Sequence, residues 1–298
     1  MARQQGEGRS TARRECPPFE VRQPATWTSP VVYAVPHSGT YYPSDLVLAS
    51  ALDRLTLRKS EDAFVDELFL PAILTGSPLI KVNYARVYLD VNREPYELDP
   101  QMFEDPLPPE ANTTSLRVAG GLGTIARVVA DGAEVYRSKL KFEAAEERVA
   151  RIYRPYHEAL AELLRAARAR FGFAVLIDCH SMPSMGAMQG DGRRRADVVL
   201  GDRFGTSCAT LLSDLAETLL RAEKLAVARN NPYAGGFTTY HYGRPAEGVH
   251  ALQIELNRAL YMDEERIAKR ADFAALAASL RRVIAGLSGL SAEPAGRV

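Results

Sequence analysis

Hydrophobic and polar positions follow two periods along this chain, and they predict strands and helices in turn. Short apolar runs, several of them rich in β-branched residues, predict strands at 31–35, 173–178, 196–200, 225–228 and 251–256. Residues 79–91 are interpreted as one or two further strands. Apolar residues at helical spacing predict helices over 132–170, 207–222 and 263–287, and Pro155 predicts a break near Arg154. This alternation is typical of a mostly parallel sheet flanked by helices.

The segments between these elements suggest how the chain is organised. Residues 94–124 are rich in Pro, Gly, Asn and Thr and predict a long irregular segment of the kind that often serves function. Its glycine-rich stretch 120–123 follows no clear strand, so we interpret it as a flexible loop on the substrate side rather than a phosphate-binding loop. We expect residues 29–290 to form a single α/β domain. Residues 1–28 are expected to be a mobile extension, or one that packs late, and residues 291–298 a loose tail.

Composition excludes several classes of protein. The 298 residues are 46% hydrophobic and 25% charged, which is typical of a soluble globular chain. Lys plus Arg equals Asp plus Glu at 37 each, so the whole chain has no electrostatic attraction to nucleic acid. No stretch approaches the roughly 18 consecutive apolar residues of a membrane helix. Three widely spaced cysteines and the absence of a secretory signal predict a cytoplasmic protein.

Polar residues that a core does not need stand at the ends of the predicted strands. His37 follows the first strand, Asn92-Arg93 and His180 follow later ones, and Glu255 lies near the end of the last. Because ligands bind at the carboxyl ends of parallel strands, these side chains are candidates for one site. Two histidines and a carboxylate make up the ligand set of a mononuclear zinc site with one position open for water.

The acidic ligand is chosen from a predicted helix start after His37. Asp62 is the first choice, with Glu61 beside it and Asp66 one helical turn further on as alternatives. A buried carboxylate such as Glu255 costs several kcal/mol unless it is paired or bound to metal, which favours a functional role for it.

The remaining histidines and the cysteine beside His180 are weighed in the same way. His157 and His250 are interpreted as ordinary polar residues with satisfied hydrogen bonds. His241 lies among aromatic residues on a predicted loop that faces substrate. Neighbouring residues in a strand point to opposite faces, so His180 is not expected to activate Cys179 as a nucleophile.

Six segments in order resemble the N-formylglutamate amidohydrolase family. They are Pro36-His37-Ser38-Gly39, Ser60-Glu61-Asp62 through Asp66, Asp90-Val91-Asn92-Arg93-Glu94-Pro95, Asp178-Cys179-His180-Ser181-Met182-Pro183-Ser184, Asn231-Pro232-Tyr233-Ala234-Gly235-Gly236 and Gln253-Ile254-Glu255-Leu256-Asn257-Arg258. The similarity runs from about residue 30 to 265. The resemblance implies a phosphorylase/hydrolase-like α/β fold related to zinc carboxypeptidases and aspartoacylase-like deacylases. It also implies one zinc ion and hydrolysis of an N-acyl amino acid.

The resemblance implies a role for each candidate residue. His37, Asp62 and His180 match the zinc ligands, and Glu255 matches the general base and proton shuttle. Asn92 and Arg93 resemble the pair that holds a substrate carboxylate, a task that suits a guanidinium fork. Arg86 is expected to polarise the scissile carbonyl. His241 is expected to contact substrate.

The expected reaction is the cleavage of an N-formyl amino acid such as N-formylglutamate to formate and the free amino acid. A zinc hydrolase of another N-acyl amino acid or small peptide is an alternative. A metal-free module that binds a carboxylate ligand is a third interpretation. The ligand types leave Mn²⁺, Fe²⁺, Co²⁺ and Ni²⁺ open beside zinc.

Overall fold

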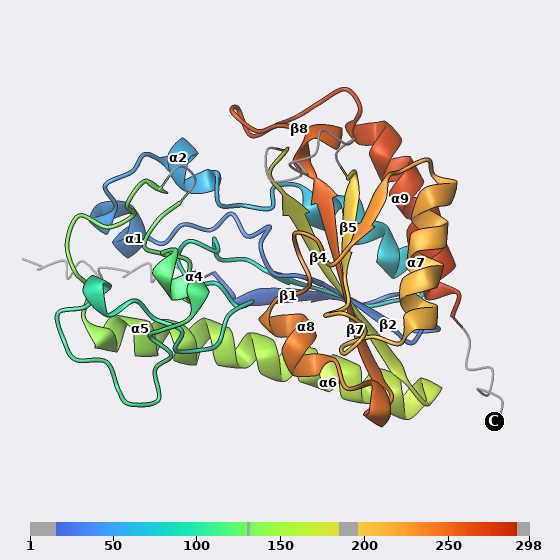
Figure 1. Ribbon diagram of the computed structural model, residues 1–298, viewed down its shortest axis with the longest axis horizontal. Helices are drawn as coiled ribbons and strands as arrows, with labels where there is room; N and C mark the ends of the chain where they lie inside the picture. The colour runs from blue at the N-terminus through green and yellow to red at the C-terminus, as the bar shows by residue number, and fades with distance from the viewer. Residues whose placement is uncertain (1–15, 130–131, 185–195, 291–298) are drawn as a thin grey trace, which may run out of the picture.

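The computed structural model describes residues 16–129, 132–184 and 196–290, and builds them around a seven-stranded sheet (Figure 1). The strands are β1 (Phe19–Arg22), β2 (Val31–Val35), β3 (Leu79–Val82), β4 (Ala174–Met182), β5 (Val198–Gly201), β6 (Val227–Arg229) and β7 (Val249–Asn257). Their order is β1-β3-β2-β4-β7-β5-β6. The β1–β3 and β5–β7 pairs are antiparallel and the other four are parallel. The predicted mostly parallel, mixed sheet is therefore confirmed.

Helices cover both faces of the sheet. α6 (Arg154–Phe171) and the short α8 (Phe237–Tyr242) pack on one face, and α3 (Val65–Phe69), α7 (Thr210–Ala222) and α9 (Phe273–Ser288) pack on the other (Figure 1). The other α-helices are α1 (Ser44–Ala49), α2 (Arg54–Arg58), α4 (Leu116–Ala119) and α5 (Phe142–Arg148). Turns of 3-10 helix span Leu70–Thr75, Pro100–Met102, Pro245–Glu247 and Arg258–Leu260. No helix in the described ranges is long and apolar enough to cross a membrane.

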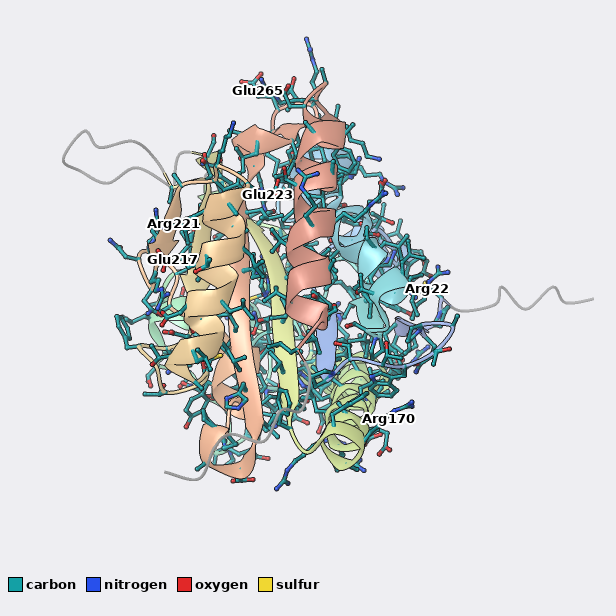
Figure 2. All side chains as sticks on the ribbon, turned by 90° about the vertical axis from the view of Figure 1, so that its right-hand side faces the viewer. Arg22, Arg170, Glu217, Arg221, Glu223 and Glu265 are labelled. Atoms are coloured by element: carbon teal, nitrogen blue, oxygen red, sulfur yellow. The ribbon has the colours of Figure 1, made fainter. Side chains whose placement is uncertain are left out.

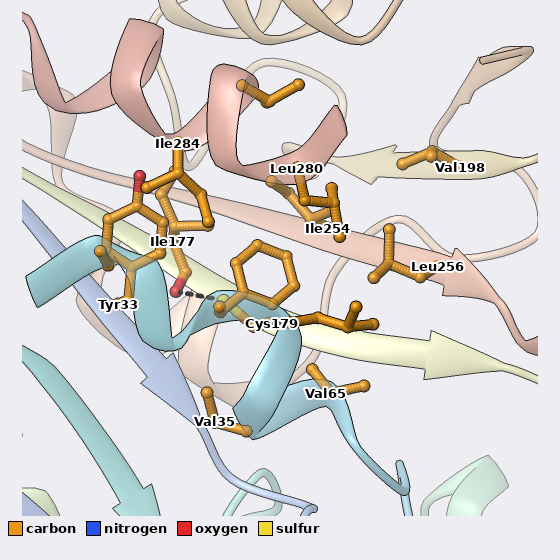
Figure 3. Close-up of a cluster of buried hydrophobic side chains, with 14 of the residues drawn as sticks. Tyr33, Val35, Val65, Ile177, Cys179, Val198, Ile254, Leu256, Leu280 and Ile284 are labelled. Carbon is orange, nitrogen blue, oxygen red and sulfur yellow. Dashed lines mark hydrogen bonds between the residues drawn. The ribbon is translucent and has the colours of Figure 1, made fainter. Parts of the chain in front are cut away.

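The alternation of side chains along the central strands creates two separate cores. In β2, Val31, Tyr33 and Val35 face α9, whereas Val32 and Ala34 face α6. The α9 side is completed by side chains from β4 and β7, with Cys179 in the middle of the cluster (Figure 3). Strands buried on both faces read as continuous apolar runs, which is why these were visible in the sequence.

The helices of the second face show their charged sides to solvent. Figure 2 looks onto α7 and α9, which lie side by side, with Glu217 and Arg221 on the outer surface of α7. These two residues form an i,i+4 ion pair of 2.7 Å. Arg282 of α9 donates from Nε to Glu223 at the end of α7 over 2.6 Å. Exposed pairs of this kind add little stability, so the buried apolar side of each helix must hold it in place.

Three predicted elements have different boundaries in the structure. Residues 133–141 are not helical, because Tyr136 and Leu140 form isolated bridges with Ser50 and Phe103; the helix starts at Phe142. The expected break near Arg154 is a π-helical turn over Val149–Tyr153. The last helix starts at Phe273 rather than 263, since β8 (Met262–Asp263) and β9 (Ala268–Lys269) pair as a hairpin first.

The strand predicted over residues 79–91 is correct only for its first four residues. β3 ends at Val82, and the backbone then turns, with Tyr88 and Leu89 both donating to the carbonyl of Ala85. Arg86, Asp90 and Asn92 therefore lie beyond β3 and not on a strand.

The expected N-terminal extension is partly built into the sheet. Phe19–Arg22 forms β1, which pairs with β3 from Phe19–Val82 to Arg22–Leu79. For these four residues the expectation of a mobile extension is wrong, because β3 offers them an open edge. Residues 1–15 and the expected loose tail 291–298 lie outside the described residues.

His157 ties α6 to the site side of the sheet. Its Nε2 lies 2.9 Å from the Val91 carbonyl and its Nδ1 lies 2.8 Å from the Tyr242 hydroxyl. Both ring nitrogens are therefore satisfied by the neutral imidazole, as predicted for this residue. Burial, with a smaller contribution from His241, lowers the pKa of His157 to about 4.

We expect His157 to make the fold sensitive to acid. A histidine with an ordinary pKa near 6.5 when unfolded and about 4 when folded stabilises the fold fully above pH 6.5. That contribution, roughly 3 kcal/mol, is lost as the pH falls from 6.5 toward 4. Urea unfolding at pH 7 and pH 4.5 should show a smaller acid-induced loss in His157→Gln than in wild type. Equal losses in both proteins would assign the sensitivity to other groups.

Candidate metal centre and active site

Two neighbouring strands bring four polar side chains to one face of the sheet. β4 and β7 pair in register, with Asp178 opposite Gln253 and His180 opposite Glu255. Their neighbours in each strand, Cys179 among them, point into the apolar core on the other face (Figure 3). β4 continues to Met182, so Cys179 and His180 lie on opposite faces and the cysteine cannot be activated by this histidine.

His37 and Asp62 come to the same place from the end of β2 and the bend before α3. The Asp62 amide donates to the His37 carbonyl over 3.0 Å, and the Ser38 hydroxyl donates to the Asp62 carbonyl over 2.7 Å. The prediction that Asp62 lies in the first turn of a helix is wrong. Phe64 takes a left-handed conformation with φ of 66°, and α3 begins only at Val65.

Three ligand-type atoms converge in this buried cluster. His37 Nδ1 lies 3.0 Å from His180 Nδ1, and Asp62 Oδ2 lies 3.3 Å from the first and 3.1 Å from the second. All three side chains are at least 97% buried. Among the described residues, only these three form a group of His, Cys, Asp or Glu that could hold a metal ion.

The contacts of the two Nε2 atoms, which point away from the cluster, determine whether the two Nδ1 atoms inside it donate or accept hydrogen bonds. His37 Nε2 lies 2.7 Å from Asp90 Oδ1, and His180 Nε2 lies 2.9 Å from Asp178 Oδ2. A carboxylate accepts, so each Nε2 carries the proton of its neutral ring and each Nδ1 is an acceptor. Two acceptor nitrogens and a carboxylate oxygen then face one point, an arrangement that positive charge at its centre, a proton or a metal ion, would stabilise.

The donor set fits a tetrahedral metal. Ligands at 2.0–2.1 Å from zinc lie about 3.3–3.4 Å apart in a tetrahedron, close to the separations seen here. Carboxylates that fix the outer nitrogens of ligating histidines are also typical of such sites. Three protein ligands would leave a fourth position for water, and all three line one cavity.

The charges around the cluster favour positive charge at its centre. Burial opposes it, but Asp178 and Asp62 raise the pKa of His180 well above its ordinary value. Burial would also raise the pKa of Asp62, yet the two histidines and Arg86 hold it well below its usual range. Arg258 supports the same carboxylate, donating from Nη2 to Asp62 Oδ1 over 3.0 Å.

The alternatives for the acidic ligand are engaged elsewhere. Glu61 accepts from the Tyr42 hydroxyl over 2.7 Å and forms an ion pair with Arg58. Asp66 forms an ion pair of 2.9 Å with Lys81. The structure thus brings Asp62, and neither Glu61 nor Asp66, to the histidines.

Glu255 lies beside the cluster, held by a defined contact. Gln253 accepts from the Gly236 amide at its Oε1 and donates from its Nε2 to Glu255 Oε1, both over 2.9 Å. The second oxygen of Glu255 has no hydrogen-bond partner among the described residues. Burial is the main cause that raises the pKa of Glu255 to about 7.

Arg86, Asn92 and Arg93 surround the other side of the cluster. Arg86 donates to Asp90 over 2.7 Å, and its Nη1 lies 3.9 Å from Asp62 Oδ1. Arg93 donates from Nε to the Leu122 carbonyl and from Nη1 to the Asn92 carbonyl, both over 2.8 Å. Burial lowers the pKa of Arg93 to about 10.

The side chain of Asn92 is used within the protein. Its Oδ1 accepts from the Thr238 amide over 2.8 Å, and its Nδ2 lies 3.4 Å from Asp178 Oδ2 and 3.2 Å from His180 Nε2. A Cβ at position 236 would lie 2.6 Å from Asn92 Oδ1, so only glycine allows this close approach. Asn92 therefore helps to fix the positions of His180 and Asp178.

A cavity of about 550 Å³ opens over these residues. All the predicted site residues except His241 line it, and so does the glycine-rich stretch through Gly120, Leu122 and Gly123. His241 instead stacks on Phe237 within α8, with ring centroids 5.0 Å apart. The prediction that placed His241 against substrate has no support in this position.

Four further residues contribute to the site although the sequence analysis gave them no role. Asp90, Asp178, Gln253 and Arg258 each hold a predicted functional side chain. Asp178 and Gln253 were recognisable from parity, since each lies two residues before a predicted site residue in the same strand. No local pattern indicates that Arg258 reaches Asp62.

Comparison with known proteins gives a concordant result. The family model of N-formylglutamate amidohydrolase matches residues 29–262. N-formylglutamate deformylase of Pseudomonas aeruginosa is 33% identical over 264 residues, which are 87% of this chain and 92% of that protein. N-formylglutamate deformylase of Pseudomonas putida is 29% identical over 79% of this chain and 82% of that protein.

Solved structures show the same fold. The crystal structure of N-formylglutamate amidohydrolase from Ralstonia eutropha JMP134 superposes with a TM-score of 0.86 at 36% identity, covering 92% of this chain and 98% of that one. The gene product Atu2144 from Agrobacterium tumefaciens, 18% identical with a TM-score of 0.64 over 90% and 94% of the two chains, shares the fold. The chain therefore belongs to the N-formylglutamate amidohydrolase family and is a hydrolase that acts on an amide bond.

Proposed function

We propose that this enzyme hydrolyses the formyl amide bond of N-formylglutamate, releasing formate and the free amino acid, with one zinc ion held by His37, Asp62 and His180. The observation that carries the proposal is the position of Glu255, a buried carboxylate with one free oxygen at the rim of the His-Asp-His cluster. Membership of the family supports the substrate. The three free cysteines support the expected reducing, cytoplasmic location.

The proposed reaction uses the chain's own groups in a simple order. When bound, the metal supplies a water of lowered pKa and polarises the carbonyl. Glu255 accepts a proton from the attacking water at its free oxygen and then delivers it to the departing amine. Gln253 donates a hydrogen bond to the other oxygen of Glu255, so the proton binds at the free oxygen.

The arginines orient the substrate. Arg86 lies at the cavity wall with its charge shared between Asp90 and Asp62, and we propose that it stabilises the negative charge that develops on the formyl oxygen. Arg93 has only Nη2 free of main-chain carbonyls, and we propose that this group binds the α-carboxylate. The Asn92 carbonyl, which accepts from Arg93 Nη1, holds that guanidinium in place.

Metal content tests the cluster directly. Purified wild type should hold about one zinc per chain by mass spectrometry. Asp62→Asn and His180→Ala should lose most of it, because two ligands hold the ion weakly. Asp66→Asn is the matched control, since Asp66 is paired with Lys81 outside the cluster, and it should keep the metal. Retention in Asp62→Asn with loss in Asp66→Asn would exchange the two assignments.

Glu255→Gln tests the general base. Removing such a group costs about 10²- to 10⁴-fold in turnover, while the metal ligands stay intact. We therefore expect kcat to fall by that factor with zinc still bound. Glu247→Gln, an exposed change in the turn before β7, should leave kcat unchanged. Near-full activity of Glu255→Gln would contradict the assignment of the base.

A substrate panel tests the acyl group. We expect N-formyl-L-glutamate to be cleaved with a higher kcat/KM than N-acetyl-L-glutamate, because the N-formyl carbon bears only hydrogen beside the crowded cluster. The cavity is also lined by the aliphatic residues Val87, Val128 and Val129, which could contact a larger acyl group. Other N-acyl amino acids are therefore the second candidate class of substrate. A clear preference for the acetyl compound would favour that second class and leave the metal site unaffected.

A further inference from the structure

One exposed cation at the cavity, Arg117, has no role in the reaction above. Five Lys or Arg side chains line it, and four have partners: Arg86, Arg93 and Arg258 lie within 4.0 Å of Asp62 or Asp90, and Lys59 also makes an interaction. The fifth, Arg117, is exposed and makes no ion pair or side-chain hydrogen bond with any residue that the structure describes. An unpaired guanidinium at a cavity wall is available to an anionic ligand.

Arg117 is linked to Arg93 through a single residue. The end of α4 is a Schellman turn, in which Gly121 donates to Val118 over 2.8 Å and Leu122 donates to the Arg117 carbonyl over 2.7 Å. Gly121 has a φ of +73°, which this turn requires and which glycine adopts without strain. The carbonyl of Leu122 in turn accepts from Arg93 Nε. The turn thus joins the backbone of Arg117 to the side chain of Arg93, and the charge of Arg117 adds to burial in lowering the pKa of Arg93.

The groups nearer the cluster cannot bind two carboxylates. Both ends of the Asn92 amide are occupied by Thr238 and by the Asp178–His180 pair. Arg93 has one terminal nitrogen left, beside Asp90, which suits the α-carboxylate next to the scissile amide. A second carboxylate, further along the substrate side chain, needs a cation further from the cluster.

We propose that Arg117 binds the side-chain carboxylate of the substrate and so selects N-formyl derivatives of acidic amino acids. The inference rests on the proposed function, because it takes the α-carboxylate to be held by Arg93. Arg86 and Arg258 are fixed against Asp62 and Asp90, so they are not free for this task. Arg117 is then a specificity residue that takes no part in bond cleavage.

The test compares two substrates that differ in one charge, N-formyl-L-glutamate and N-formyl-L-glutamine. Loss of a charged hydrogen-bond partner should lower kcat/KM of Arg117→Gln for the glutamate compound by about 10- to 100-fold, mainly through KM. The value for the glutamine compound should stay within about twofold of wild type, and this retained activity also reports a folded enzyme. Arg117→Lys, which keeps the charge, should restore part of the preference.

Arg127→Gln is the matched control. Arg127 belongs to the same segment, but it is paired with Asp99 over 2.8 Å and with Glu134 over 3.4 Å, and it does not line the cavity. This variant should keep the wild-type ratio of the two substrates.

Two outcomes overturn the inference. An equal fall for both substrates in Arg117→Gln would mean that Arg117 does not read the side-chain charge. Unchanged kcat/KM values for both substrates would mean that another group reads it. If the zinc-loaded wild type cleaves neither N-formyl compound, the proposed function itself fails. Cleavage with no effect of Arg117 leaves the proposed function standing and removes only this inference.

Discussion

The site depends on one electrostatic constraint, the burial of two imidazole acceptors and a carboxylate that face one point. In the neutral rings, Asp90 and Asp178 hold the protons of His37 and His180 on the outer nitrogens, so the contact between the inner nitrogens joins two acceptors. Such a contact repels unless positive charge lies between the acceptors. Arg258 and Arg86 offset part of the negative charge of Asp62 and Asp90 but stay outside the centre. The protein therefore builds a place for a cation and accepts the desolvation cost of the groups around it.

The sheet explains why the chemical part of the site could be predicted from the sequence. An apolar run marks a strand buried on both faces, and the polar residue at its end is visible because nothing in a core requires it. This reasoning located His37, His180 and Glu255, and the same runs predicted the order of strands and helices. Residues two apart in a strand share a face, so Asp178 and Gln253 lie on the same face as His180 and Glu255. The hydrophobic period of an element and the position of a polar residue at its end are local properties, so a single sequence is enough to recognise them.

The parts that the sequence could not reveal depend on contacts between distant segments. Asp62 reaches the cluster because its amide bonds to the His37 carbonyl, 25 residues away, and not because it begins a helix. The strand interpretation of residues 79–91 failed after Val82 because the chain turns there, and the hydrogen bond from the Asp90 amide to the Thr124 carbonyl supports that turn. Phe19–Arg22 became a strand because β3 has a free edge, and His241, which does not line the cavity, stacks on Phe237 and meets His157 edge-on. Propensity cannot predict such outcomes when tertiary contacts decide them.

Strands and loops thus hold different parts of the function. Asp178, His180 and Glu255 stand on buried strands, His37 follows one, and Asp62 and Asp90 are hydrogen-bonded to His37. If these residues act as proposed, a change among them disturbs the chemistry itself. Arg93 and Arg117, which we propose to bind the substrate's carboxylates, lie against and within the irregular segment 94–124, which pairs with none of the seven strands of the sheet. Loops on a rigid scaffold tolerate change, and specificity commonly lies in them. Because Leu122 joins Arg93 to Arg117, a shift of this segment would move both arginines together. Substrate choice can therefore change there while the cluster of His37, Asp62 and His180 stays as it is.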